Sequence, residues 1–422
     1  MNTRNGSSGW FYMSCLLVLV ILFSISLFLP GCGFQHGSFP ICKQFQDLPL
    51  TEVTSPDPKL VFEEDTKIKV MHGFGTAKLN SGNYMKVEQV VPVPAYVNQA
   101  TVFLNGWRLN YLGDDQHVLG LGALITNIKF DRRSSKLTWN AVGVLRDDDA
   151  KEAYSLTYYY TVIAWNDTAV SLTVDQGNPD DLCKDHYFWT DNTGTTTALS
   201  SFSSFIEKPD FPSGRPVAVL PRGFGFAWTG GDHHLLQMAY NLDHGEIFAE
   251  NKKQYKKRDG EIPAPLPAPP ASRVDSGFVS WDTYSIFKDD SGRRGYAFGE
   301  MVSALGGNDV GVLQPPFSIL PIKGVGGGAL GGGVQTKEYV IENIPFQYAI
   351  PLLTGWELGY LTDDQHVKDV GVWIGDWSYE LGAGKLHYWL SSILADNDKL
   401  PGHYDRHKVT VLGIRPVAGV VR

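Results

Sequence analysis

The feature that most constrains the fold is a stretch that occurs twice with little change. Residues 106–118 read GWRLNYLGDDQHV, and residues 355–367 read GWELGYLTDDQHV. The offset of 249 residues (356 − 107) continues without a gap to Asp149 and Asp398. Self-similarity of this length indicates that the chain is built from copies of one structural unit.

A third, more divergent copy lies between these two. An offset of 117 residues (234 − 117) matches residues 223–235, GFGFAWTGGDHHL, to the first copy. Further along, Trp281 matches Trp139 at an offset of 142, so about 25 residues (142 − 117) are inserted in the middle copy. The insertion carries a basic cluster and a proline-rich run, which are typical of a solvated loop and a stiff spacer.

The repeats divide the chain into expected regions. Between the N-terminal segment and the first copy, scattered prolines and the lack of periodicity indicate a tether. We expect a signal peptide or membrane anchor at 1–32, a tether at 33–59, a first repeat at 60–168, a middle repeat at 169–311 with the insertion at 251–272, and a last repeat at 312–422.

Each copy has the period-two pattern of half-buried strands. Phe103, Trp107, Leu109 and Tyr111 share one parity, with Asn105 as the exception. The chain is also rich in aromatic residues and glycine (11 Trp, 19 Tyr, 22 Phe and 45 Gly), which favours strands joined by tight turns. We therefore predict an all-β fold of tandem antiparallel β-sandwich modules, because each sheet needs a second sheet to cover its apolar face.

The first 32 residues form a separate segment with an apolar run from Trp10 to Leu29. Such a run is either an export signal or a single membrane-spanning helix. Its end, Leu29-Pro30-Gly31-Cys32, resembles a bacterial lipoprotein signal, which implies cleavage before Cys32 and lipid attachment to that residue. The alternative is an uncleaved anchor. Both predict an exported, membrane-tethered protein at the cell surface or in the periplasm.

Cysteine content and charge narrow the remaining possibilities. Beyond Cys15 and Cys32, the body contains Cys42 and Cys183, and either a disulfide between them or two separate thiols fits an exported protein. The net charge of −9 argues against a nucleic-acid partner, because such a partner favours a basic surface.

An Asp-x-His element recurs in all three copies, and it is the main candidate for chemistry. Because residues i and i+2 of a strand point the same way, we expect each carboxylate to reach its own imidazole. A metal site, a general-base pair and a ligand contact are all conceivable, but we favour a structural turn. His233 and His244 occur in the middle copy only and raise the metal interpretation there. The three elements are Asp115/His117, Asp232/His234 and Asp364/His366.

Acidic turns form a second candidate set. Clustered carboxylates at a turn are able to hold Ca²⁺, although their spacing does not match an EF-hand loop. Turn geometry is the interpretation that we favour, and the cofactor stays open between none, Ca²⁺ and a transition metal. The residues are Asp147, Asp148, Asp149, Asp289, Asp290, Asp396 and Asp398.

The tryptophans fall into two groups. Trp107, Trp356, Trp139 and Trp281 occupy matched positions, so we expect them in the core. Trp373 and Trp377 occur in the last copy only, which makes them candidates for a surface that stacks on sugar rings.

Each unit resembles the H-type lectin module in its order of features. In the first copy these are Val102-Phe103-Leu104 before the Gly-Trp strand, Leu137-Thr138-Trp139, an acidic turn, and a closing Val162-Ile163-Ala164-Trp165. The resemblance implies a compact β-sandwich that binds sugars and often trimerises. It carries no individual sugar-contacting residue over to this chain.

Together these patterns predict a non-enzymatic, membrane-tethered surface protein that binds a glycan or another cell-surface ligand, with its oligomeric state left open. One alternative is an exported metal-dependent hydrolase with its site at Asp232, His233 and His234, in which Asp232 and His234 are the candidate metal ligands. The other alternative is a purely structural envelope or shell component.

Overall fold

The computed structural model describes much of the chain from Leu48 onward. The described residues are 48–114, 116–149, 151–177, 187–192, 199–207, 217–242, 274–275, 278–289, 295–313, 318–319, 333–360, 365–396 and 403–416. Within these ranges the regular secondary structure consists of strands, and each pairing between two named strands is antiparallel. The expected all-β, antiparallel class is therefore confirmed.

The strands fall into three sets, which we call units 1, 2 and 3. Unit 1 contains β3 (Ile68–Leu79), β4 (Tyr84–Pro92), β5 (Gln99–Tyr111), β6 (Gly120–Asp131), β7 (Lys136–Arg146) and β8 (Tyr154–Trp165). Unit 2 contains β9 (Thr173–Asp175), β10 (Tyr187–Asn192), β11 (Leu199–Glu207), β12 (Val217–Trp228), β13 (Gln237–Leu242), β14 (Val274–Asp275), β15 (Phe278–Lys288) and β16 (Tyr296–Gly306). Unit 3 contains β17 (Val310–Leu313), β18 (Ser318–Ile319), β19 (Gln335–Ile341), β20 (Phe346–Tyr360), β21 (Asp369–Glu380), β22 (Lys385–Ala395) and β23 (His403–Pro416). Two short strands, β1 (Val53–Thr54) and β2 (Lys59–Glu64), extend unit 1 on its N-terminal side and pair with β3.

The three units have the same strand order. Unit 1 forms the half-sheets β3-β8-β5 and β4-β7-β6, unit 2 forms β10-β16-β12 and β11-β15-β13, and unit 3 forms β17-β23-β20 and β19-β22-β21. In units 2 and 3 the leading strand is split in two, because β9 and β10 both pair with β16, and β17 and β18 both pair with β23. Strand β17 begins at Val310 and so straddles the boundary expected at 311/312.

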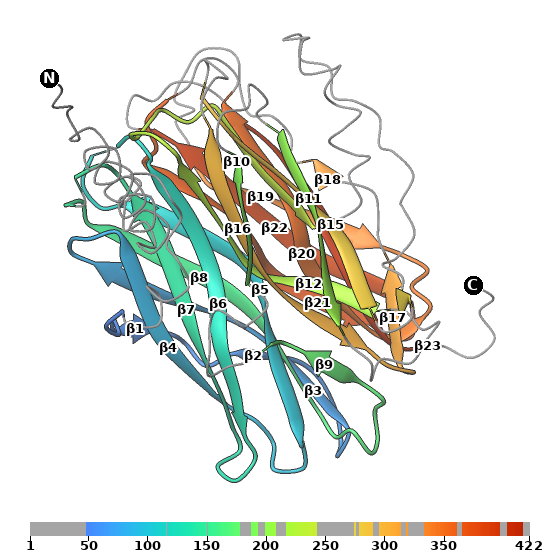
Figure 1. Cartoon of the computed structure of the whole chain (residues 1–422). Coiled ribbons are helices and arrows are strands. Elements are labelled where there is room, and N and C mark those ends of the chain that lie inside the picture. The colour runs from blue at the N-terminus through green and yellow to red at the C-terminus, as the bar shows by residue number, and fades with distance from the viewer. Residues whose placement is uncertain are drawn as a thin grey trace, which may run out of the picture. The chain divides into compact units, whose positions relative to one another are not determined.

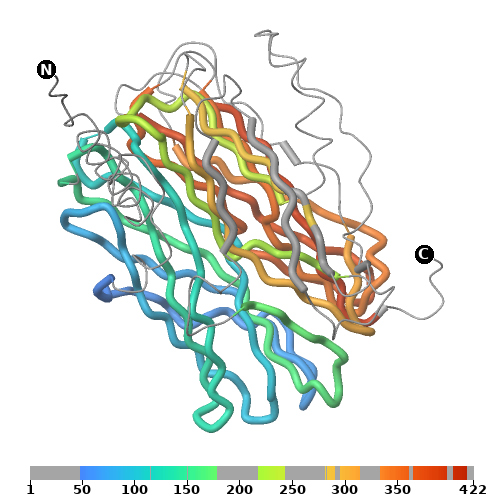
Figure 2. Tube along the Cα trace, in the orientation of Figure 1, coloured from blue at the N-terminus to red at the C-terminus, as the bar shows by residue number. Residues whose placement is uncertain are grey.

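The units interleave and do not form separate modules in a row. Each sheet joins a half-sheet of one unit to a half-sheet of the next, through β5–β21, β12–β6 and β20–β13. The contact between unit 1 (blue to green) and unit 3 (orange to red) at β5 and β21 is visible in Figure 1. The same path can be followed along the Cα trace in Figure 2. We call these three strand pairings the inter-unit seams.

The seams have matching registers. Gly106–Asn110 pairs with Asp369–Trp373, Gly223–Ala227 with Gly120–Leu124, and Gly355–Gly359 with Gln237–Asn241. Their side chains differ. Arg108 forms an ion pair with Asp369 at 2.5 Å, Gln237 donates a hydrogen bond to Glu357 at 2.9 Å, and glycines (Gly225 and Gly120) occupy the equivalent positions of the third seam. The backbone arrangement is thus repeated while the polar contacts are not.

The seams also explain the glycine that opens each repeat. A Cβ atom on Gly106 would lie 2.1 Å from Trp373 Cβ, and one on Gly223 would lie 2.4 Å from Leu124 Cα. Gly106 also has a φ of +148°, a backbone conformation that L side chains rarely adopt. Glycine is therefore required here because the neighbouring unit's strand passes too close for a side chain.

A β-bulge precedes this glycine in every unit. The register shifts between Leu104 and Gly106, between Pro221 and Gly223, and between Leu353 and Gly355. The bulged residues are buried polar side chains with internal partners. They are Asn105, which donates to Pro351 O and accepts from Leu353 N, Arg222, which donates to Val302 O, and Thr354, which contacts Thr410.

The bulge corrects one detail of the predicted alternation. Along the unbroken strand β8, Tyr158 and Tyr160 share a face, and they pair with Trp107 and Leu104 respectively. Leu104 therefore lies on the same face as Trp107, and Phe103 lies on the opposite face. A strict period of two predicts the reverse. The observed faces differ because a bulge shifts the alternation by one residue.

Aromatic rings from all three units meet at the centre. Trp107 packs against Phe224 at 4.9 Å and against Trp356 at 5.2 Å, and Phe224 packs against Trp356 at 4.9 Å between ring centroids. All three side chains are at most 2% exposed. Trp139 and Trp281 are also buried, so the core assignment of the matched tryptophans is confirmed.

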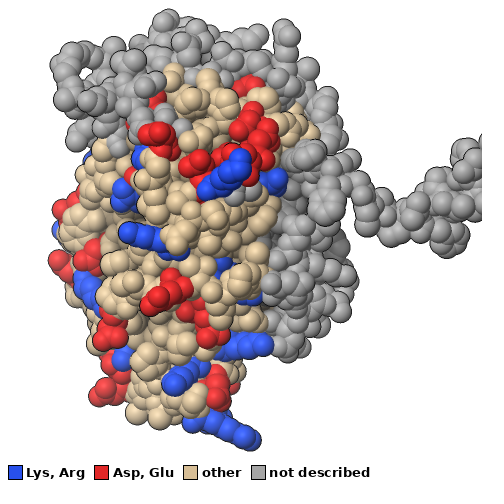
Figure 3. Space-filling model, turned by 90° about the vertical axis from the view of Figure 1, so that its left-hand side faces the viewer, with Lys and Arg blue, Asp and Glu red and all other residues tan. Residues whose placement is uncertain are grey.

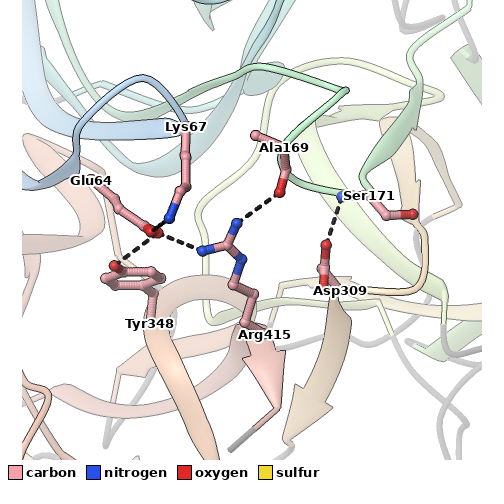
Figure 4. A network of polar contacts seen from close by, with 7 residues as sticks. All are labelled: Glu64, Lys67, Ala169, Ser171, Asp309, Tyr348 and Arg415. Carbon is pink, nitrogen blue, oxygen red and sulfur yellow. Dashed lines mark hydrogen bonds and ion pairs between the residues drawn. The ribbon is translucent and has the colours of Figure 1, made fainter.

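A polar network joins units 1 and 3 at the end of β20 farther from the Asp-x-His segments (Figure 4). Glu64 accepts hydrogen bonds from Lys67, from Arg415 at 2.6 Å and from Tyr348 at 3.1 Å. Arg415 also donates to Ala169 O at 2.7 Å. Burial alone raises the pKa of Glu64, but these hydrogen bonds outweigh burial and leave it below its usual value.

We expect the central aromatic cluster to carry much of the stability that joins the units. Replacing Trp107 with Ala should lower the free energy of unfolding by about 3–5 kcal/mol, because it leaves a cavity among three units. Trp107→Phe is the matched control, since Phe224 already fills the equivalent position in unit 2. Urea unfolding of the full chain measures both variants. Equal losses in the two variants would contradict a packing role for this ring.

Candidate functional site

The three Asp-x-His segments meet and form a closed ring of backbone hydrogen bonds. Each histidine is flanked by two residues that form isolated antiparallel bridges to the other two units. Each bridge has two hydrogen bonds, with N–O distances between 2.9 and 3.1 Å. The bridges are Gln116 with Val367, Val118 with His233, and Leu235 with Gln365. The ring fixes the backbone on both sides of every histidine.

The three histidine side chains cluster inside this ring. The ring centroids of His117, His234 and His366 lie 4.6 Å apart in all three pairs. One ring nitrogen of each histidine lies within 4.8 Å of the corresponding nitrogens of the other two. All three residues are partly exposed, and the side chain of His117 is 42% exposed. The structure thus brings together three imidazoles that the sequence places in three separate copies.

Asp232, the carboxylate of these segments that the structure describes, does not follow the expected pairing. Asp232 Oδ1 lies 3.6 Å from Nδ1 of His117, which belongs to a different unit. The prediction had paired Asp232 with its own His234. Because the copies interleave, a carboxylate in one segment comes beside the imidazole of another. The equivalent residues Asp115 and Asp364 lie outside the described residues.

The additional histidine of the middle copy has a different environment from the cluster. The ring of His233 packs edge-on against Trp228, with 5.5 Å between centroids and an interplanar angle of 89°. Its backbone contributes to the ring through the bridge to Val118. The structure therefore separates His233 from the His234 cluster, although the sequence had grouped them. His244 lies outside the described residues.

The three imidazoles form a donor set that suits a transition metal, since imidazole nitrogens bind Zn²⁺, Cu²⁺, Ni²⁺ and Fe²⁺. The sequence matches these histidines by position but does not show that they converge. A closed threefold arrangement places equivalent residues of all copies near one axis. The signal was the recurrence of His at the same repeat position in every copy.

The acidic turn of unit 1 provides a second cluster. Oxygens of Asp147, Asp149 and Glu152 lie within 4.8 Å of one another. Lys151 lies in the same turn and forms an ion pair with Asp149 at 2.8 Å. Hydrogen bonds from Lys151 are the main reason that the pKa of Asp149 lies below its usual value. A cation of the protein itself therefore already balances part of this charge. Of the remaining acidic candidates, Asp290 and Asp398 lie outside the described residues.

The two tryptophans proposed for sugar stacking are packed against other residues. Trp377 is 0% exposed, and Trp373 is 6% exposed and stacks on Tyr159 at 5.4 Å with an interplanar angle of 6°. Trp373 also belongs to a small apolar cluster with Ile393 and Ala395. Neither side chain offers an open ring face.

A buried carboxylate in unit 2 escaped the sequence analysis. Glu300 on β16 is 0% exposed and accepts hydrogen bonds from Trp281 Nε1 at 3.0 Å, Thr283 Oγ1 at 2.8 Å and Tyr240 OH at 3.1 Å. Burial raises the pKa of Glu300 to about 7, and these hydrogen bonds offset only part of that effect. At an offset of 142, the equivalent residue of unit 1 is Tyr158, and the strand register places His407 at the same position of unit 3.

Several predicted features fall on parts of the chain that the structure does not describe. They are the apolar run at 10–29, Cys32, Cys42 and Cys183, and the insertion at 251–272. Among the described residues, we find no helix with the length and apolar character needed to cross a membrane.

Comparisons with known proteins give no family. No family model matches the chain, and no curated protein matches it. Among solved structures, a chain from "Structure of infectious bursal disease virus Gt strain" aligns over 94% of this chain and 87% of that chain, with 9% identity and a TM-score of 0.12. A TM-score this low carries no argument about fold or function.

The buried Glu300 should make stability depend on pH. Its folded pKa of about 7 lies above the usual 4.5, so the folded state holds the proton more tightly than the unfolded state does. The contribution of Glu300 to the free energy of unfolding should therefore fall as the pH rises from about 4.5 to about 7, by about 3 kcal/mol. Burial lowers the pKa of His72 to about 4 and that of His407 to about 3, so these residues act in the opposite direction over part of the same range.

Glu300→Gln should remove this contribution and change the slope of the pH profile between about 4.5 and 7, because the amide keeps the shape of the side chain and accepts from Trp281 and Thr283 without titrating. Urea unfolding between pH 4 and 8 measures it, with Glu88→Gln at an exposed position of β4 as the control. A Glu300→Gln profile that is parallel to the wild-type profile would exclude Glu300 as the cause.

Proposed function

We propose that this protein is a non-enzymatic surface protein, held at a membrane through its N-terminal segment, whose body is a rigid block of three β-sandwich units. The observation that carries the proposal is the antiparallel pairing of strands from different units at three seams of matching register. One chain thereby builds the arrangement that a homotrimer would otherwise form from three chains. The Asp-x-His segments serve this architecture directly, since their backbones join the units.

The distribution of surface charge fits a scaffold that is exposed to water. On the face drawn in Figure 3, acidic and basic side chains are interspersed and separated by uncharged areas. Mixed surface charge with a net charge of −9 favours solubility and gives no broad basic area on this face for an anionic polymer. The apolar run and the Leu29–Cys32 sequence supply the proposed export signal and tether.

The tether can be tested on the N-terminus of the exported protein. We expect mass spectrometry to show a mature chain that begins at a lipid-modified Cys32 and fractionates with membranes. Cys32→Ser should prevent lipid attachment, so that the protein is either released from the membrane or stays there unprocessed. Cys15→Ser, within the apolar run, should leave the mature form unchanged. A mature chain that still carries residues 16–29 would show an uncleaved anchor instead.

Recognition of a glycan is the second candidate function. The observation that favours it is Phe74 on β3, which is 40% exposed and lies 5.7 Å from the ring of Tyr159. The Arg108–Asp369 ion pair joins β5 and β21 of the same sheet. Aromatic rings with polar groups nearby are the usual means of binding the apolar faces of sugars.

A glycan array probed with the full chain tests this second function. Phe74→Ala should lower binding to any glycan that the wild type retains by about tenfold, which corresponds to about 1.4 kcal/mol. Val340→Ala is the control, because Val340 is 47% exposed on β19 of the same sheet. Equal binding by all three proteins would exclude Phe74 as a contact.

A further inference from the structure

The three-histidine cluster has the properties of a metal site. Its nitrogens come from three units and lie within 4.8 Å of one another. The six backbone hydrogen bonds of the ring hold the residues on either side of each histidine, so the imidazoles are positioned before any ion arrives. Preorganised ligands lose little conformational freedom on binding, which favours affinity.

We propose that His117, His234 and His366 bind one divalent transition-metal ion of the zinc class at the point where the three units meet. Three imidazole nitrogens suit a late first-row ion, whereas Ca²⁺ and Mg²⁺ take oxygen ligands. Zinc–nitrogen bonds are about 2.0–2.1 Å long, so tetrahedral ligands lie about 3.4 Å apart. The nitrogen atoms, which lie within 4.8 Å of one another, would therefore draw together by at most about 1.4 Å (4.8 − 3.4) when the ion binds.

The surroundings of the cluster support an ion with one coordination position open to solvent. The side chain of His117 is 42% exposed, so water has access to the cluster. Three protein ligands and one water complete the tetrahedral coordination that zinc prefers. The bound ion would connect all three units where the ring closes, while the Glu64–Arg415 network joins units 1 and 3 at the far end of β20.

Asp232 is a positioning residue for this site. Its Oδ1 lies 3.6 Å from Nδ1 of His117, and its side chain is 21% exposed. A carboxylate beside one ring nitrogen holds the proton there and leaves the other nitrogen to bind the metal. A rotation that shortens this contact to hydrogen-bond length would accompany metal binding. The role that the sequence suggested for Asp232, direct coordination, is thus replaced by orientation of an imidazole from another unit.

The test is metal binding by the full chain after treatment with a chelator and dialysis. Titration with Zn²⁺ against a chromophoric chelator should give one ion per chain. His117→Ala, His234→Ala and His366→Ala should each lower the affinity by about 100-fold or more, and Asp232→Asn by about 10- to 100-fold. Ca²⁺ and Mg²⁺ should not compete. Zn²⁺ should raise the unfolding temperature of the wild type, because it binds the folded state.

Two controls separate the cluster from other histidines. His387→Ala removes a histidine that contacts Glu338 at 2.9 Å on a different part of the surface. His233→Gln alters the neighbour that packs on Trp228. Both should bind Zn²⁺ like the wild type. If His387→Ala or His233→Gln loses the ion while the cluster variants keep it, the proposed site is wrong.

A measurement on the wild type keeps the proposal testable even if a cluster variant does not fold. X-ray absorption at the zinc edge should show nitrogen or oxygen ligands at about 2.0–2.1 Å, with the outer-shell pattern of imidazoles. Substitution with Co²⁺ should give the visible absorption of a tetrahedral site. Absence of zinc uptake by the wild type, or zinc bound without imidazole ligands, would overturn the proposal.

Discussion

Backbone hydrogen bonding between units is the interaction on which the rest of the structure depends. At each seam, the strand that carries the Gly of the repeated stretch (β5, β12 or β20) pairs with the strand that follows the Asp-x-His segment of another unit (β21, β6 or β13). A strand edge in a sandwich is normally a liability, because its unpaired amide and carbonyl groups invite association with other chains. Here one edge of each half-sheet is paired within the same polypeptide. The glycine at the start of each seam, such as Gly106, exists to allow that approach.

The central aromatic cluster and the histidine cluster are consequences of the same arrangement. Once equivalent strands surround one axis, any residue type that recurs in the repeat and points inward meets its own copies. Apolar copies such as Trp107 and Trp356 pack against one another and exclude water. The histidine copies, ten residues further along the repeat, also meet one another, but they lie nearer to solvent. Their ring nitrogens lie within 4.8 Å of one another. The histidine cluster and the hydrophobic core thus follow from one geometric cause.

The sequence predicted the number of copies and the strand character of each because both depend on local pattern. It also placed Trp139 and Trp281 correctly in the core, since recurrence at matched positions signals packing. It did not predict the seams, because an isolated copy carries no information about which neighbour completes its sheet. The pairing of Asp232 with His117 was missed for that reason. Glu300 was missed because the equivalent positions hold Tyr158 in unit 1 and His407 in unit 3, so the repeat gives no sign of a carboxylate there.

Covalent fusion of the three units has a further consequence for how the seams can change. In a homotrimer, one substitution alters three interfaces at once. In this chain, the ion pair of Arg108 and Asp369 belongs to one seam, and the hydrogen bond of Gln237 and Glu357 belongs to another. Each copy is therefore free to diverge on its own. The chemical differences between the seams give each edge its own complementary partner, so the order of the units around the axis is encoded in side chains as well as in connectivity.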